Sequence, residues 1–194
     1  MQFKVINPKV EVSGKSILGM VEGLPTVKER ILQILIDNNI ENPQKDKWYP
    51  QQNWLDAFKT IFEVFGPNTL YVVGNKISEN TKWPREFDSI EKALASIDIA
   101  FHMSHRIEDK ILYDPETGTM KEGIGHYRFE KIDDKEVKMI CNNSYPCDFD
   151  RGIITNTARI FVPKNSKFLR VEHDDSGLCR NNGDNQCNYI VKWF

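Results

Sequence analysis

Apolar residues recur at helical spacing through the first half of the chain. The stretches 26–38, 50–65 and 89–103 each place them at i, i+3 and i+4, which is the pattern of an amphipathic helix. Thr26 and Glu29 form a capping-box pattern at the start of the first stretch. A short helix or turn is expected at 16–24, a loop at 41–49, and a further helix at 69–80, where a strand is the alternative.

The pattern changes after about residue 110. Segments 126–132 and 136–142 flank a polar turn and predict a β-hairpin. A helix is expected at 147–161, followed by strands at 167–174 and 186–193. This order predicts an α+β fold in which an N-terminal helical half packs on a C-terminal antiparallel sheet with one inserted helix. We expect one ligand-binding domain over 1–194, with a helical part at about 14–106 and a sheet part at about 107–194.

Composition narrows the class of protein. The 194 residues carry a formal net charge of -2, which gives no electrostatic reason to expect nucleic acid as a partner. No apolar run approaches the roughly 20 residues of a membrane span. The N-terminus lacks the apolar region of a secretory signal, so we expect a cytoplasmic protein with reduced thiols.

Three of the four cysteines, Cys147, Cys179 and Cys187, lie in the last third of the chain near a short acidic and histidine-containing cluster. Zinc is held by four thiolate, imidazole or carboxylate ligands in a tetrahedron, so a zinc site is one prediction. Ordinary buried thiols and a Cys179–Cys187 disulfide are the alternatives. Cys141 follows the apolar positions of its strand and is expected in the core.

The same region carries a family resemblance. The residues concerned are Cys147, Gly152 opening a helix, Glu172 on a strand, Cys179, Gly183, Cys187 and the aromatic Tyr189. With them, residues 136–193 resemble the 4-vinyl-reductase-type domain. That domain belongs to the superfamily of the haem-based nitric-oxide sensor domain and the TRAPP vesicle-tethering subunits. The resemblance implies a small-molecule sensor, and it makes a homodimer a reasonable expectation.

The resemblance also implies a ligand set. In the related sensor domains of aromatic-responsive bacterial transcription activators, matching cysteines hold a structural zinc together with a glutamate. Carried over, this points to the three cysteines already named. Ser176 stands where an acidic residue would be needed, so the fourth ligand has to come from Glu172, His173, Asp174 or Asp175, and we select His173 and Asp175 as candidates.

A second group of polar residues ends the helix predicted at 89–103. His102, His105 and Arg106 are candidate contacts for a ligand, and His126 is a further candidate. The superfamily's nitric-oxide sensors use a proximal histidine and a Tyr-x-Ser-x-Arg motif for haem. This chain has only His-x-Ser-x-Arg, at 102–106. In the alternative interpretation His102 packs in the core and His105 interacts, as a cation, with the last carbonyls of the helix.

Aromatic residues of the helical half predict an apolar pocket. Trp54 and Phe58 represent them, since small-molecule pockets are lined mostly by such side chains. Arg151 is a candidate for a bidentate contact to a ligand carboxylate. The alternative is a local salt-bridge network of Arg151 with Asp148 and Asp150.

These features favour a sensory or regulatory domain for a hydrophobic or aromatic small molecule, with a structural zinc site. Three alternatives stay open: a haem-based gas or redox sensor, a metal-dependent enzyme acting on a tetrapyrrole or aromatic compound, and an interaction module of the vesicle-tethering type. No set of residues has the context of a known nucleophile, so we expect a binding protein rather than an enzyme and name no catalytic residue.

Overall fold

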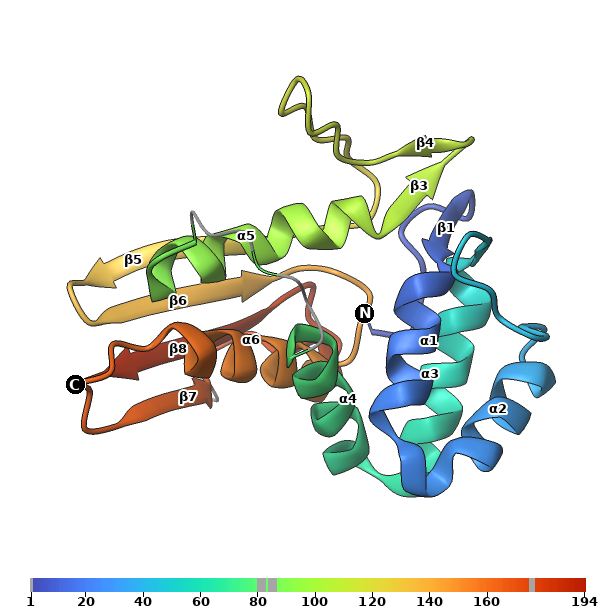
Figure 1. Cartoon of the computed structure of the whole chain (residues 1–194), viewed down its shortest axis with the longest axis horizontal. Coiled ribbons are helices and arrows are strands. Elements are labelled where there is room, and N and C mark those ends of the chain that lie inside the picture. The colour runs from blue at the N-terminus through green and yellow to red at the C-terminus, as the bar shows by residue number, and fades with distance from the viewer. Residues whose placement is uncertain (1, 80–82, 84–86, 175–176) are drawn as a thin grey trace.

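The computed structural model describes residues 2–79, 83, 87–174 and 177–194. The first helices of the chain lie at one end of the molecule, and a four-stranded sheet with later helices alongside it extends at the other (Figure 1). The helices are α1 (Gly14–Gly23), α2 (Lys28–Asp37), α3 (Gln51–Phe65), α4 (Pro67–Glu79), α5 (Ile90–Met103) and α6 (Cys147–Phe161). The helix expected at 69–80 is therefore confirmed as α4, apart from residue 80, which lies outside the described residues.

The larger sheet is antiparallel in the order β5–β6–β8–β7. Its strands are β5 (Tyr127–Asp133), β6 (Glu136–Cys141), β7 (Leu169–His173) and β8 (Cys187–Trp193). Val137, Met139 and Cys141 of β6 are buried and alternate with less buried residues, so one face of the strand carries the core. The predicted α+β fold and the core position of Cys141 are confirmed.

A second, small sheet was not predicted. It has the order β2–β1–β3–β4, with β1 (Val10–Ser13), β2 (Trp48–Pro50), β3 (His105–Ile107) and β4 (Lys110–Ile111). The segment expected to be a loop thus ends in a strand. Each strand is only two to four residues long. Such strands carry almost no periodic signal, and β1 and β3 pair across a large sequence separation.

The predicted capping box was wrong. Pro25 begins a short 3-10 helix, Pro25–Val27, and α2 begins only after it, at Lys28. Val27 occupies the N-cap position, and no side chain caps the helix there. The fixed φ of Pro25 favours the early turn, which places Thr26 inside the turn instead of at the cap.

One apolar core joins the two halves of the molecule. Phe58 of α3 makes edge-to-face contacts with Trp54, Tyr145 and Phe149, with ring centroids 4.7, 5.6 and 4.9 Å apart. All four rings are buried. Such contacts add specific geometry to the burial of large apolar surfaces, and they fix α3 against the start of α6. No helix within the described ranges is both long enough and apolar enough to cross a lipid bilayer.

Helices α4 and α6 cross at a pair of glycines. A Cβ added at Gly152 would meet the backbone oxygen of Tyr71 and, at 3.0 Å, the backbone nitrogen of Asn75. A Cβ at Gly74 would similarly meet the backbone of Phe149. Gly152 lies inside α6 instead of opening it, and its role is to permit this close approach.

We therefore expect Gly152→Ala to lower the free energy of unfolding by about 1–3 kcal/mol, because backbone atoms cannot move aside as flexible side chains can. Gly19→Ala is the matched control: it lies inside α1 with no atom within 4 Å of the added Cβ. It should raise the stability by about 0.5–1 kcal/mol. Urea unfolding of both variants measures the difference, and equal effects would contradict the close-approach explanation.

Candidate functional site

A small apolar pocket lies between the helical half and the sheet. Its volume is about 130 Å³, and its walls include Trp54, Phe101, Tyr127, Tyr145 and Phe149, with His105 as the ionisable imidazole. These residues come from α3, α5, β3, β5 and α6 and from the segment before α6, so the pocket depends on the contact between the two halves. A cavity of about 150 Å³ binds benzene in another protein, which sets the size of ligand that this space accepts without opening.

His105 is the polar group of this pocket. Its Nδ1 lies 2.7 Å from the carbonyl oxygen of Phe101, and its Nε2 lies 2.8 Å from the hydroxyl of Tyr145. A carbonyl can only accept, so Nδ1 carries the proton and Nε2 accepts from the tyrosine. Burial lowers the pKa of His105 to about 4, so the ring is neutral at pH 7. The helix-end interaction expected for His105 exists, but a neutral ring makes it instead of a cation.

Of the two aromatic residues that were predicted as ligand contacts, one lines the pocket and the other supports its wall. Trp54 lines the pocket directly. Phe58 lies behind the wall, where its ring contacts Trp54, Tyr145 and Phe149. The aromatic residues of the helical half therefore form both the pocket lining and the core around it.

The structure places the remaining predicted contacts outside the pocket lining. Arg106 binds Glu11 at 2.6 Å and its guanidinium lies over Trp48. His102 is fully buried on α5, where its Nδ1 lies 2.8 Å from the backbone oxygen of Asp98. Residues 102 and 105 are separated because α5 ends at Met103, so His102 lies on the helix while His105 begins β3.

Arg151 makes the local ion pair that was the alternative interpretation. Its Nη2 lies 3.1 Å from Asp148, and its guanidinium lies over the ring of Tyr71. Asp150 does not join this pair. It turns into the core and binds Arg180, which is equally buried.

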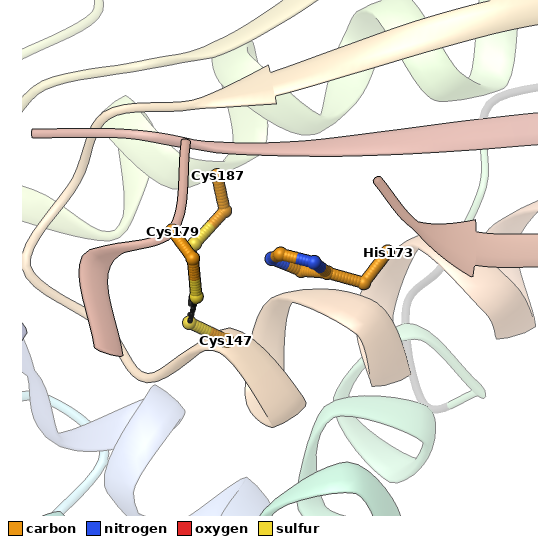
Figure 2. Close-up of side chains that lie close together, drawn as sticks. All are labelled: Cys147, His173, Cys179 and Cys187. Atoms are coloured by element: carbon orange, nitrogen blue, oxygen red, sulfur yellow. Dashed lines mark hydrogen bonds between the residues drawn. The ribbon is translucent and has the colours of Figure 1, made fainter. Parts of the chain in front are cut away.

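The thiol cluster is the second candidate site. Cys147 begins α6, Cys187 begins β8, Cys179 lies in the connecting loop, and His173 ends β7 (Figure 2). One ligand atom from each of the four lies within 4.8 Å of the others. Asp175, the other candidate for the fourth ligand, lies outside the described residues.

One sulfur–sulfur distance within this cluster matches that of a zinc site, and another is shorter. The sulfur of Cys147 lies 3.8 Å from that of Cys179 and 3.1 Å from that of Cys187. Zinc–sulfur bonds of about 2.3 Å in a tetrahedron place sulfurs about 3.8 Å apart. All four cysteines are free thiols, so the alternative Cys179–Cys187 disulfide is not formed.

Charge also favours a thiolate at this cluster. The backbone N–H and the Nε–H of Arg180 donate to the sulfur of Cys187 at 3.3 and 3.4 Å. The hydrogen bond from Cys147, with the charge of Arg180, holds the pKa of Cys187 well below that of an ordinary thiol. The same pairing and burial raise the pKa of Cys147, so a single proton lies between the two sulfurs.

Sequence analysis missed the residues that support the cluster. Arg180 is completely buried and also donates to Asn143, with its Nη1 2.6 Å from the amide oxygen. Asp150 accepts hydrogen bonds from both Arg180 and the hydroxyl of Tyr127. One signal was present: Asp150 lies four residues before the buried Ile154 on the same helix face, which is an unusual place for an unpaired carboxylate.

Comparisons with known proteins support this architecture. No protein-family model and no curated protein matches the chain. An H-NOX protein from K. algicida superposes with a TM-score of 0.66 at 13% identity, covering 94% of this chain and 96% of that one. An H-NOX protein from S. oneidensis in its Fe(II)NO state gives 0.65 at 11% identity, covering 94% and 99%. A variant of Tt H-NOX gives 0.60 at 14% identity, covering 93% and 94%.

The chain has the H-NOX fold. These neighbours belong to the haem nitric-oxide-binding branch of the superfamily indicated by the sequence, and one is described in a study of haem distortion in the H-NOX family. At such low identity the likeness establishes the fold and leaves function to the residues. The finer resemblance to the 4-vinyl-reductase type stays a prediction.

The buried His105 predicts a specific pH dependence. Its pKa is about 4 in the folded protein and near 6.5 when unfolded. The unfolded state therefore takes up a proton as the pH falls below 6.5, and the folded state does so only near 4, so stability decreases over this window. Between pH 7 and pH 5 the wild type should lose about 2 kcal/mol more stability than His105→Gln. Urea unfolding of both proteins at both pH values measures the difference. Equal losses of stability in the two proteins would contradict the low pKa of His105.

Proposed function

We propose that this protein is a sensor domain that binds haem in the pocket beside His105 and responds to a diatomic gas. The observation that carries the proposal is the tautomer of the buried, neutral His105 side chain. Its Nδ1 proton is fixed on the Phe101 carbonyl, which leaves the Nε2 lone pair directed toward the pocket-lining Tyr145. A neutral histidine with this tautomer is the ligand that haem iron requires.

The imidazole of His105 suits haem as an iron ligand, but the pocket in its present form is too small for haem. His105 would hold the iron, and the aromatic side chains of Trp54, Phe101 and Phe149 would face the macrocycle. Tyr145 would have to release Nε2, and the pocket of about 130 Å³ would have to widen. Haem would supply reversible gas binding at its iron, and the chain would supply the imidazole and a shielded apolar environment.

The propionate groups of haem would need partners other than those of the Tyr-x-Ser-x-Arg motif. Within the described part of the chain, no arginine or lysine lines the pocket. Arg106, the arginine of the His-x-Ser-x-Arg sequence, is paired with Glu11 and Asp109. Among the described residues that line the pocket, Ser104 would offer a hydroxyl group as a hydrogen-bond partner for a propionate.

The pocket volume favours a second candidate function, the sensing of a small apolar or aromatic molecule. Such a ligand would occupy the existing space and leave the His105–Tyr145 hydrogen bond intact. The predominance of aromatic walls around one polar pair is typical of a small-molecule site.

We also propose that Cys147, His173, Cys179 and Cys187 bind a structural zinc ion. The support is the convergence of four suitable ligand atoms within 4.8 Å and the hydrogen bonds of Arg180 to the Cys187 sulfur. Such a site would join the start of α6 to β7, β8 and the loop between them. It agrees with the 4-vinyl-reductase type proposed from the sequence. A homodimer in the cytoplasm remains part of the same prediction, as does a single domain over 1–194.

Haem titration tests the leading proposal. Purified protein mixed with haem should develop the Soret band of histidine-ligated iron, and nitric oxide should shift the band of the ferrous form. His105→Ala should abolish most of this band, because no other imidazole lines the pocket among the described residues. His126→Ala, which removes an imidazole outside the pocket lining, should keep it. An unliganded haem spectrum with wild-type protein would overturn the haem proposal.

Benzene tests the second candidate independently. A saturable rise of the melting temperature with benzene, together with no Soret band, would support a small-ligand sensor. Binding of the native state alone stabilises a protein by RT ln(1 + [L]/Kd), which is about 2.7 kcal/mol at a hundredfold excess over Kd. The absence of both responses would leave neither function supported.

Metal analysis tests the zinc site. We expect the four-residue thiol cluster to hold one zinc per chain, and we expect Cys187→Ser to lose it. Chelation should lower the melting temperature, since zinc a thousandfold above its Kd contributes about 4 kcal/mol. Cys141→Ala is the control. Cys141 is buried like Cys187 but lies outside the cluster, so this variant should lose stability through packing and retain its zinc. An unchanged melting temperature after complete metal removal would contradict a structural role.

A further inference from the structure

A second group of metal-binding side chains lies outside both the pocket lining and the thiol cluster. Asp98 and His102 are four residues apart on α5, and His126 immediately precedes β5. One atom from each, suitable as a metal ligand, lies within 4.8 Å of the others. The two imidazole rings are tilted by 33° with centroids 5.0 Å apart. The group therefore joins the helix to the first strand of the main sheet.

The partners of His126 are those of a metal-bound histidine. Its Nδ1 lies 2.9 Å from Asp98, and its Nε2 lies 3.0 Å from the carboxylate of Glu122. In metal sites the ring nitrogen that does not bind the ion usually donates to a carboxylate, which fixes the tautomer and orients the ring. Glu122 already occupies that position. The backbone N–H of His126 donates to the side chain of Asn142 at 2.7 Å, which further fixes the residue.

Asp98 is also held from outside the group. Its Oδ1 accepts the backbone N–H of Tyr127 at 2.9 Å, while Oδ2 faces His126. A ligating carboxylate is normally hydrogen-bonded in this way. The side chain is 16% exposed, so the carboxylate is only slightly accessible to water.

The ion pairs of this group leave one ring nitrogen of His102 without a partner among the described residues. Its Nδ1 donates to the backbone carbonyl of Asp98 at 2.8 Å, so Nε2 carries the lone pair. Within the described part of the chain that nitrogen has no hydrogen-bond partner, and the His102 side chain is 0% exposed. A buried polar atom without a partner destabilises the folded state, and a bound ion or water would remove this cost.

We propose that Asp98, His102 and His126 bind a divalent transition-metal ion, with Glu122 as the outer partner of His126. Two imidazoles and one carboxylate are a common ligand set for zinc and ferrous iron with open positions for water. The charge of the group also suits a divalent ion. With both rings neutral, Asp98 and Glu122 give the group a net charge of about −2, which a divalent ion balances. The ion replaces the proton between Nδ1 of His126 and the carboxylate of Asp98.

This site borders the pocket without belonging to it. Phe101 and Tyr127 line the pocket, and each is next in sequence to one of the proposed histidine ligands. The ring of Phe101 contacts that of His102 at 5.5 Å. A bound ion would therefore fix the α5 wall of the pocket against β5. The proposal is independent of what the pocket binds.

Cobalt(II) titration of the full-length protein distinguishes the two metal sites. Cobalt at the thiol cluster gives an intense sulfur-to-metal charge-transfer band, whereas cobalt held by nitrogen and oxygen gives only weak visible bands. With the thiol cluster first filled by one equivalent of zinc, we expect one equivalent of cobalt to bind without the sulfur band. His102→Gln should abolish this binding.

Glu122→Gln tests the site without disturbing the fold, since the Glu122 side chain is 83% exposed. Loss of an outer carboxylate typically weakens metal binding about 10- to 100-fold, and we expect a loss of that size. Glu116→Gln, an exposed acidic residue of the same segment, is the matched control and should not change the affinity. The absence of a sulfur-free cobalt site in the wild type, or equal affinities in the Glu122→Gln and Glu116→Gln proteins, would overturn the proposal.

Discussion

A buried ion pair between Arg180 and Asp150 holds the sheet half of this protein together. Both side chains are completely buried, and removal of one partner from such a pair typically costs about 3–5 kcal/mol because the other charge is left without compensation. Arg180 lies in the loop before β8 and Asp150 in the first turns of α6. The pair therefore fixes the loop that carries Cys179 against the helix that begins with Cys147.

The contacts of this pair extend in two directions. Arg180 donates to the sulfur of Cys187, so the positive charge that neutralises Asp150 also favours a thiolate in the cluster. Asp150 accepts from the hydroxyl of Tyr127, whose ring lines the apolar pocket. The backbone N–H of Tyr127 in turn donates to Asp98. Tyr127 thus links the ion pair beside the thiol cluster to the group formed by Asp98, His102 and His126, with its hydroxyl bound to Asp150 and its backbone N–H bound to Asp98.

Helix α5 carries side chains that belong to both sites. Phe101 lines the pocket, and Asp98 and His102, four residues apart on the helix, share the face directed to His126. The pocket imidazole of His105 lies just beyond the end of the helix, at the start of β3. Burial leaves His105 neutral, whereas Asp98 and Glu122 raise the pKa of His126 despite its partial burial.

The α+β class, the main helices and the four long strands follow from the sequence, because helical spacing and strand alternation record burial directly. The core position of Cys141 follows in the same way, whereas the grouping of Cys147, Cys179 and Cys187 was expected from their residue type and from the family resemblance. Only the tertiary structure places the side chain of His173 beside the three cysteines, because the spacing of residues along the chain left several neighbouring residues as candidates. It likewise places His105 in the pocket lining and His102 and Arg106 outside it. It also pairs Asp150 with Arg180 instead of with Arg151. In each case the deciding partner is far away in sequence, and local patterns contain no information about such pairs.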